Sequence, residues 1–178
     1  MDTKGGLRAQ TRAMSLAFIR DADWLGRDRA RGYLWVLAAL NVATLGWLVA
    51  TSHGGVDRNG FLLGTDFLSF WTAGHMLVEH ANVYDLEAHV AAQRSFFAPV
   101  QGFTAFFYPP VFLPFCYPLG WFGYFPALAA WLVTTGGLFL LAARAWMRTL
   151  AISFGAFLVF VAFPPALIAV THGQTSFL

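Results

Sequence analysis

Charge is scarce in this chain of 178 residues. Asp, Glu, Lys and Arg make up 11% of it, less than half of the roughly 25% that a soluble globular domain usually carries. The stretch from Ser95 to Ala143 contains none of them, and it is much longer than the roughly 20 apolar residues that cross a bilayer once. Together with a hydrophobic content of 58%, this scarcity excludes an ordinary soluble domain and predicts an integral membrane protein.

Several kinds of chemistry lack their usual residues. The one cysteine, Cys116, has no second cysteine with which to form an internal disulfide. The patterns G-x-x-x-x-G-K-[ST], G-x-G-x-x-G and G-x-S-x-G are absent, so soluble nucleotide-driven chemistry and a serine hydrolase have no support. His75, Glu79 and His80 lie close in sequence, but their spacing misses the H-x-x-E-H metal pattern. We therefore predict a solvated polar face there and no cofactor, and nothing supports a divalent metal.

The basic residues gather at the start of the chain. Seven of the 11 Lys and Arg lie in residues 1–32, where aspartates alternate with them. This alternation does not favour nucleic acid as a partner, whereas positive charge before a first membrane segment is typical of the cytoplasmic side. We expect residues 1–32 to be a cytoplasmic segment of a multi-pass protein in a bacterial-type inner or plasma membrane.

The first and last apolar segments are expected to be membrane-spanning helices, in an all-α polytopic fold. Residues 33–50 carry no charge and are predicted to be an uncleaved signal-anchor, because no A-x-A cleavage site follows them. Residues 149–170 are predicted to span the membrane as well. Pro164 and Pro165 interrupt that span, which lipid tolerates where neighbouring helices satisfy the freed carbonyl groups.

The middle apolar run is divided by a hinge rich in Pro and Gly. We predict two further spans, 102–122 and 124–143, that form a hairpin. A single broken crossing is the alternative, and it would place Arg144 and Arg148 on the cytoplasmic side, as the positive-inside tendency prefers.

Residues 51–101 then form an extracytoplasmic loop that is too long to be a plain connector. After Asp66, apolar residues recur at helical spacing and polar residues fall on the opposite face, so we predict an amphipathic helix that lies flat on the membrane surface. Asp85 similarly precedes a shorter helix over 86–97. Two interpretations of Asp66 stay open: it caps its helix, or it is a general base whose pKa is raised by partial desolvation.

A set of short motifs recurs in a recognisable order. Asp66 is followed by Phe70-Trp71 and Ala73-Gly74, then by Val83-Tyr84-Asp85, Tyr108-Pro109-Pro110 and Gly173-Gln174. In this order, and flanked by membrane segments, the motifs resemble glycosyltransferase family 87, also described as the DUF2029 family, of the GT-C superfamily. The resemblance covers roughly residues 33–178. It differs at His80-Ala81-Asn82, where the family usually shows a glycine.

The resemblance implies a GT-C-like helical bundle and a transferase. Such an enzyme moves a hexose, often mannose, from a polyprenyl-phosphate donor to a hydroxyl group of an extracytoplasmic glycan or glycolipid acceptor, with inversion. Asp66 matches the family's acidic residue in the first outer loop and would be the catalytic base. The candidate substrate-binding residues are Trp71, His75, Tyr84, Tyr108, His172 and Gln174.

Two further expectations accompany this hypothesis. The final residues, THGQTSFL, carry no charge cluster or polar tail, so we expect residues 33–178 to be the N-terminal part of a longer membrane domain that is inactive alone. A non-enzymatic carrier or flippase component for lipid-linked saccharides is the alternative function, because interrupted membrane helices also form transport sites.

Overall fold

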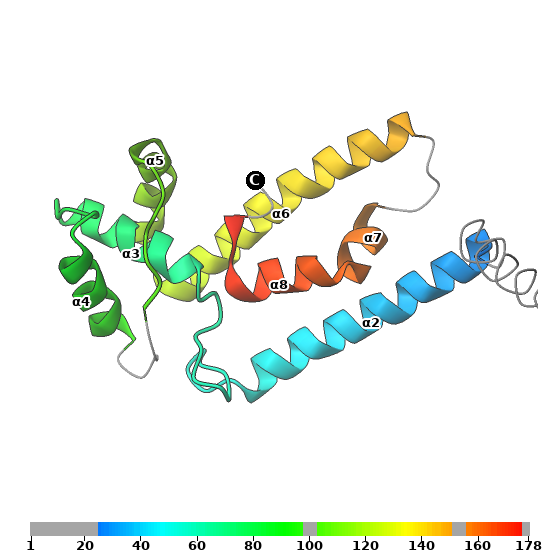
Figure 1. The fold of residues 1–178 in the computed structure, drawn as a ribbon, viewed down its shortest axis with the longest axis horizontal. Helices are drawn as coiled ribbons and strands as arrows, with labels where there is room; N and C mark the ends of the chain where they lie inside the picture. The colour runs from blue at the N-terminus through cyan, green and yellow to red at the C-terminus, as the bar shows by residue number, and fades with distance from the viewer. Residues whose placement is uncertain (1–24, 98–102, 151–155, 176–178) are drawn as a thin grey trace, which may run out of the picture.

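The computed structural model describes residues 25–97, 103–150 and 156–175 (Figure 1). Most of the 1–32 segment therefore lies outside the described residues, as do residue 102 and part of the predicted 149–170 span. Apart from isolated bridges in the 53–62 turn, the described residues form only α-helices and short 3₁₀ helices, which confirms the all-α fold class. The α-helices are α2 Arg27–Thr51, α3 Phe67–Val78, α4 Leu86–Phe96, α5 Leu113–Cys116, α6 Tyr124–Thr149, α7 Ala156–Ala162 and α8 Pro164–His172; the 3₁₀ helices are η1 Pro110–Phe112 and η2 Tyr117–Trp121.

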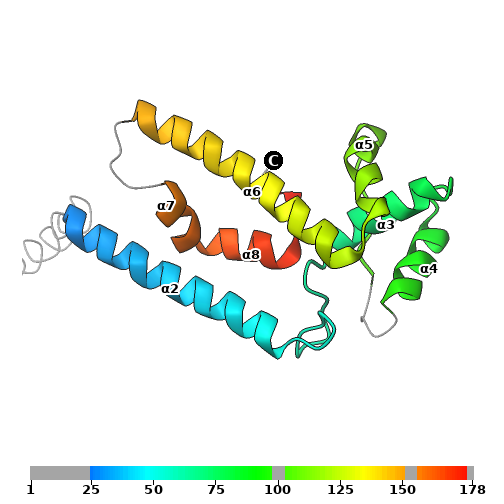
Figure 2. The ribbon, with the colours of Figure 1, turned by 180° about the vertical axis from the view of Figure 1, so that it is seen from behind.

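The helices α2 and α6 are long and apolar enough to cross a membrane. They run antiparallel, and α7 and α8 lie between them (Figures 1 and 2). The predicted segments 33–50 and 124–143 fall inside these two helices. Most residues of α2 are exposed, and Ala38 is its buried residue. Long apolar helices with exposed side chains indicate association with a membrane, while the number of crossings stays a prediction.

The predicted span over 102–122 is wrong. The described part of it begins with an extended segment and continues through η1, the four-residue α5 and η2. Proline removes an amide donor and clashes with the preceding turn of a helix. Pro109, Pro110, Pro114 and Pro118 therefore break this run before any helix is long enough to span.

The predicted interruption at Pro164-Pro165 is confirmed. α7 has seven residues and α8 has nine, and the chain is extended at Phe163 between them. The residue before a proline avoids the helical conformation, and prolines are tolerated in the first turn of the following helix. The chain bends between these two helices. Beside the bend, the Asn41 side chain of α2 donates a hydrogen bond of 2.8 Å to the carbonyl group of Val161 in α7.

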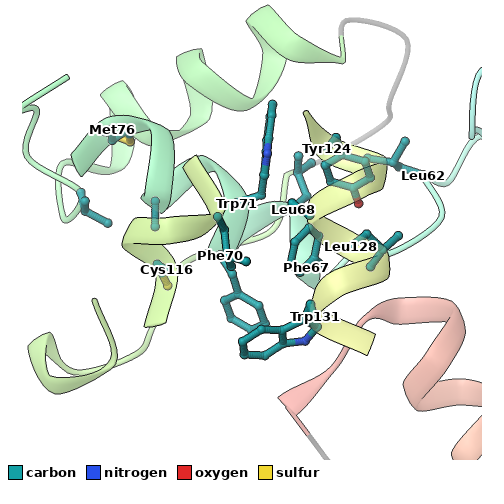
Figure 3. Packing of buried hydrophobic residues seen from close by; sticks show 14 residues of the cluster. Leu62, Phe67, Leu68, Phe70, Trp71, Met76, Cys116, Tyr124, Leu128 and Trp131 are labelled. Carbon is teal, nitrogen blue, oxygen red and sulfur yellow. The ribbon is translucent and has the colours of Figure 1, made fainter. Parts of the chain in front are cut away.

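The expectation of an amphipathic surface helix after Asp66 is also wrong, because α3 is the centre of a packed unit. Ser69 and Thr72, assigned to its solvated face, are buried. Figure 3 shows Phe67 and Phe70 of α3 directed at α6, where Phe70 and Trp131 have ring centroids 5.6 Å apart. The surroundings of α3 are α4, α5, η2 and the first turns of α6. The unit formed by α3, α4 and residues 103–122 is called the loop unit below.

A pair of glycines sets how closely the loop unit packs. A Cβ atom added at Gly74 of α3 would collide with the carbonyl oxygen of Cys116 and would lie 2.7 Å from the amide nitrogen of Gly120. A Cβ atom at Gly120 would in turn collide with the backbone of Gly74. The two backbones touch, so only glycine fits at this crossing. This contact fixes α5 and η2 against α3.

Candidate functional site

A cleft of about 570 Å³ lies at the N-terminal end of α3. It is bounded by the start of α3, by the extended segment 103–108 and by the residues that follow α8. Its walls mix polar groups with aromatic rings, as ligand sites commonly do. The lining residues are Asp66, Phe70, Phe103, Thr104, Ala105, Phe107, Tyr108, Gln174 and Thr175.

Asp66 lines this cleft without capping its helix. Its backbone is already helical, with φ −75° and ψ −32°, and its side chain makes no capping hydrogen bond. Its carboxylate takes no part in the hydrogen bonds recorded among the described residues. Asp85, by contrast, accepts a hydrogen bond of 3.1 Å from the amide of Ala88. Capping is therefore confirmed for Asp85 and wrong for Asp66, whose half-buried carboxylate remains available to a ligand.

The end of α8 is bonded directly to the turn that carries Asp66. The amide of Asp66 donates to the carbonyl group of His172 at 2.9 Å, and the amide of Gly64 donates to that of Thr171 at 2.8 Å. Gly173 then turns the chain with a φ of 65°, and a Cβ atom there would lie 2.6 Å from Cβ of Phe67. Positive φ combined with this close contact demands glycine. The turn brings Gln174 to the cleft that Asp66 also lines, although Asp66 comes more than one hundred positions earlier in the chain.

The extended wall 103–108 is held from behind by α4. Gln93, which is buried, donates from Nε2 to the carbonyl group of Thr104 at 2.7 Å and accepts from the Thr104 amide at 3.0 Å. The Thr104 hydroxyl donates to the carbonyl group of Thr65, next to Asp66, at 2.9 Å. Gln93 therefore satisfies the amide and the carbonyl group of Thr104, which have no partner in a helix or a strand because residue 104 belongs to neither.

Tyrosines fix the far end of the same wall. The Tyr84 hydroxyl donates to the carbonyl group of Tyr108 at 2.9 Å, and the Tyr108 hydroxyl lies 2.9 Å from the hydroxyl of Thr175. Tyr108 therefore connects the wall to the segment after α8. Contacts between distant parts of the chain therefore hold the walls of the cleft together.

The structure brings together only some of the residues predicted from the sequence. Asp66, Tyr108 and Gln174 line the cleft, and Tyr84 supports it from outside through Tyr108. The role of each in binding stays a prediction.

Trp71, His75 and His172 lie elsewhere. The Trp71 indole donates to the carbonyl group of Phe122 at 2.9 Å, and its ring packs on His75, with centroids 4.2 Å apart. Burial lowers the pKa of His75, although the neighbouring Glu79 opposes this. The His172 side chain is exposed and folds back toward the carbonyl group of Ile168, so only its backbone reaches the Asp66 turn.

Sequence reasoning missed the residues that shape the cleft, above all Thr104, Thr175 and Gln93. Each is a polar residue in or beside an apolar run, and this is the only signal that could have drawn attention to them. Within the described ranges, no group of at least three His, Cys, Asp or Glu side chains is placed to hold a metal ion. Glu79 and His80 are exposed at the opposite end of α3.

A second cleft, of about 590 Å³, lies between α6 and α7. Its lining is apolar, so it offers no group that could act as an acid, a base or a nucleophile. The cleft at Asp66, by contrast, carries a carboxylate, a phenol and an amide in its lining. The lining residues of the apolar cleft are Phe139, Ala142, Ala143, Trp146, Met147, Val159, Phe160 and Phe163.

Comparison with known proteins gives one positive result. No curated protein and no solved structure matches the chain. Residues 106–178 match the model of Glycosyltransferase family 87. The matched range includes Tyr108-Pro109-Pro110 and Gly173-Gln174, and it begins after Asp66. The family predicted from the motifs is thus confirmed over residues 106–178, and the match supports a glycosyltransferase associated with the membrane.

Proposed function

We propose that this protein transfers a hexose from a polyprenyl-phosphate donor to a hydroxyl group of an extracytoplasmic glycan or glycolipid. One observation carries the proposal. The uncapped carboxylate of Asp66 lines the same cleft as Tyr108 and Gln174, which belong to the range that matches the glycosyltransferase family. A carboxylate, a phenol and an amide in one cleft suit a substrate rich in hydroxyl groups.

In the proposed reaction, Asp66 is the general base. Its carboxylate accepts the proton of the acceptor hydroxyl while that oxygen attacks the anomeric carbon of the donor. The bond between the anomeric carbon and the phosphate oxygen breaks, and polyprenyl phosphate leaves with the bonding electrons, so that the configuration inverts. A positioned base of this kind accelerates a reaction by about 10²–10⁴-fold. Tyr108 and Gln174 would orient the hydroxyl groups of the sugar.

The position of the cleft suits a donor that is embedded in lipid. The loop unit follows the end of α2 and precedes the start of α6, and it lies at that end of the two long helices (Figure 1). The cleft is lined by the start of α3 and by residues 103–108, so it lies at that end too. Arg144 and Arg148 lie near the opposite end of α6, at the same end of the molecule as the start of α2. Because Arg27 and its basic neighbours also lie there, the positive-inside tendency supports a cleft outside the cytoplasm.

The test uses membrane vesicles that contain the protein expressed from its complete reading frame. A polyprenyl-phosphate hexose, labelled in the sugar, is supplied with candidate acceptors. The proposal predicts a new glycosidic bond of inverted configuration and one polyprenyl phosphate released per bond. Both products should fall about 10²–10⁴-fold in Asp66→Asn, and undiminished transfer in that variant would refute the assignment of the base.

The same experiment separates the transferase from a carrier. The bend between α7 and α8 at Phe163 resembles the discontinuous helices of transporters. A carrier would move the labelled lipid to the other leaflet without forming a glycosidic bond. That result, obtained with every acceptor, would contradict the proposed function.

A further inference from the structure

The segment 107–125 has an outer face that nothing in the described structure covers. Its inner side packs on α3 through Cys116, Leu119 and Gly120, all of them buried. The hydrogen bond from the Trp71 indole to the carbonyl group of Phe122 holds its end. Seven large apolar side chains of the segment are exposed, and we call them the aromatic face: Phe107, Val111, Phe115, Tyr117, Trp121, Phe122 and Phe125.

The aromatic face is unusually apolar for a surface in water. Phe107 is 88% exposed, Val111 72% and Trp121 63%. No charged residue occurs between Ser95 and Ala143, so the segment that carries the face contributes no charge to it. Soluble surfaces place charged residues between such side chains, and a contiguous apolar patch marks an interaction site.

We propose that the aromatic face lies in the interfacial layer of the bilayer, among headgroups and upper acyl chains, on the side where α6 enters. Continuity with α6 is the first argument. Phe122 is followed directly by Gly123 and the start of α6, which is long and apolar enough to span. Phe125, in the first turn of α6, belongs to the face. In both ribbon views α5 extends from α3 on the side along which α6 runs, away from α4 (Figures 1 and 2).

The backbone supplies the second argument. Residues 103–109 form no helix or strand, and irregular backbone exposed to hydrocarbon leaves amide groups unsatisfied, which excludes it from the centre of a bilayer. At the interface those groups meet water and headgroups. The run of prolines also removes amide donors that would otherwise need partners. The face also includes Trp121 and Tyr117, and tryptophan and tyrosine are the residue types enriched at the interface between membrane and water.

This placement goes beyond the proposed transfer reaction and does not depend on it. It gives the membrane-surface role, first predicted for the helix after Asp66, to a different part of the loop unit. Phe107 belongs both to the aromatic face and to the lining of the cleft. The mouth of the cleft therefore opens beside the lipid headgroups.

The test measures depth in the membrane with a fluorophore attached to a single cysteine. Cys116, which is buried, is first replaced by alanine (Cys116→Ala), so that each introduced cysteine is the single labelling site in this sequence. Phe115→Cys and Trp121→Cys place the fluorophore on the aromatic face, and Glu87→Cys on the exposed side of α4 is the matched control. All three positions are exposed, so the substitutions remove no core packing. The protein, expressed from its complete reading frame, is reconstituted in phosphatidylcholine vesicles that carry nitroxide-labelled lipids.

The expected result is strong quenching at positions 115 and 121 by a shallow nitroxide, weaker quenching by one near the bilayer centre, and no lipid quenching at position 87. Strongest quenching at the centre would show that the segment crosses the membrane. Iodide quenching equal to that at position 87 would show that the face is in water. Protection from both quenchers would show that protein covers it. Each of these three outcomes would overturn the proposal.

Discussion

The helices α3 and α2 are both mainly apolar, yet their surroundings are opposite. Nine of the 12 residues of α3 are buried, whereas in the 25 residues of α2 the buried one is Ala38. α3 is enclosed by other parts of the chain, so its folding is stabilised by contacts within the protein. α2 exposes most of its apolar surface and requires lipid or further protein to cover it. Hydrophobicity alone therefore does not say which apolar segment lies in the membrane.

A pair of glycine substitutions gives the largest expected contrast between the two helices. In α3, a methyl group at Gly74 would collide with backbone atoms that cannot move aside, so Gly74→Ala should lower the free energy of unfolding by about 3 kcal/mol. In α2, nothing lies within 4 Å of a Cβ atom at Gly46, so Gly46→Ala should be neutral or stabilise by up to about 1 kcal/mol. Thermal unfolding in nanodiscs measures both. Equal destabilisation by the two variants would break the comparison.

Gln93 provides a second way to sharpen the contrast, because its buried side chain holds the extended wall of the loop unit through two hydrogen bonds. Gln93→Ala would leave the amide and carbonyl groups of Thr104 without the partners they have now. Each unsatisfied buried group costs about 1–3 kcal/mol, so we expect a loss of about 2 kcal/mol in unfolding free energy. Arg94→Ala, on the exposed side of the same helix, should change it by less than about 0.5 kcal/mol. A loss in Gln93→Ala no larger than that control would contradict the role given to Gln93.

The smallest expected effect is a dependence on pH that arises in the loop unit. His89 is buried, its ring nitrogen Nδ1 lies 3.2 Å from the carbonyl group of Val83, and burial lowers its pKa below the ordinary 6.5. The folded state therefore holds His89 neutral, while the unfolded state takes up a proton below pH 6.5. The stability that His89 contributes is complete above that pH and is lost as the pH falls below it.

Lowering the pH from about 7.5 to about 5.5 should therefore cost up to about 1 kcal/mol of unfolding free energy through this residue. His89→Gln should reduce the slope of stability against pH. An unchanged slope in His89→Gln would show that another group is responsible.

The sequence was sufficient where a local rule decides the structure. Helix α2, the helix that Asp85 caps and the break at Pro164-Pro165 follow from uninterrupted apolar composition, from a capping side chain and from proline geometry. The motifs Tyr108-Pro109-Pro110 and Gly173-Gln174 also indicated the family that residues 106–178 match. None of these predictions needs knowledge of a distant contact.

The sequence was not sufficient where a tertiary contact decides. The alternating polar residues of α3 indicated a water-exposed face, but the contact between Gly74 and Gly120 and the aromatic packing on Trp131 bury it. Of the predicted site residues, Trp71 and His75 lie on the side of α3 that packs on Phe96 and Phe122 rather than on the cleft. Gln93 and Thr104 lie 11 positions apart in the sequence, so only the folded chain shows their pairing.

The most direct measurement compares two aspartates that stand at the start of two helices. Asp66 lines the cleft without capping α3, whereas Asp85 caps α4 and is exposed. The rate of hexose transfer per folded molecule is measured for Asp66→Asn and Asp85→Asn, with the unfolding temperature of each. We expect Asp66→Asn to lose at least about 100-fold of the rate at an unchanged unfolding temperature, and Asp85→Asn, which keeps a good capping residue, to retain both. A wild-type rate in Asp66→Asn would contradict the account.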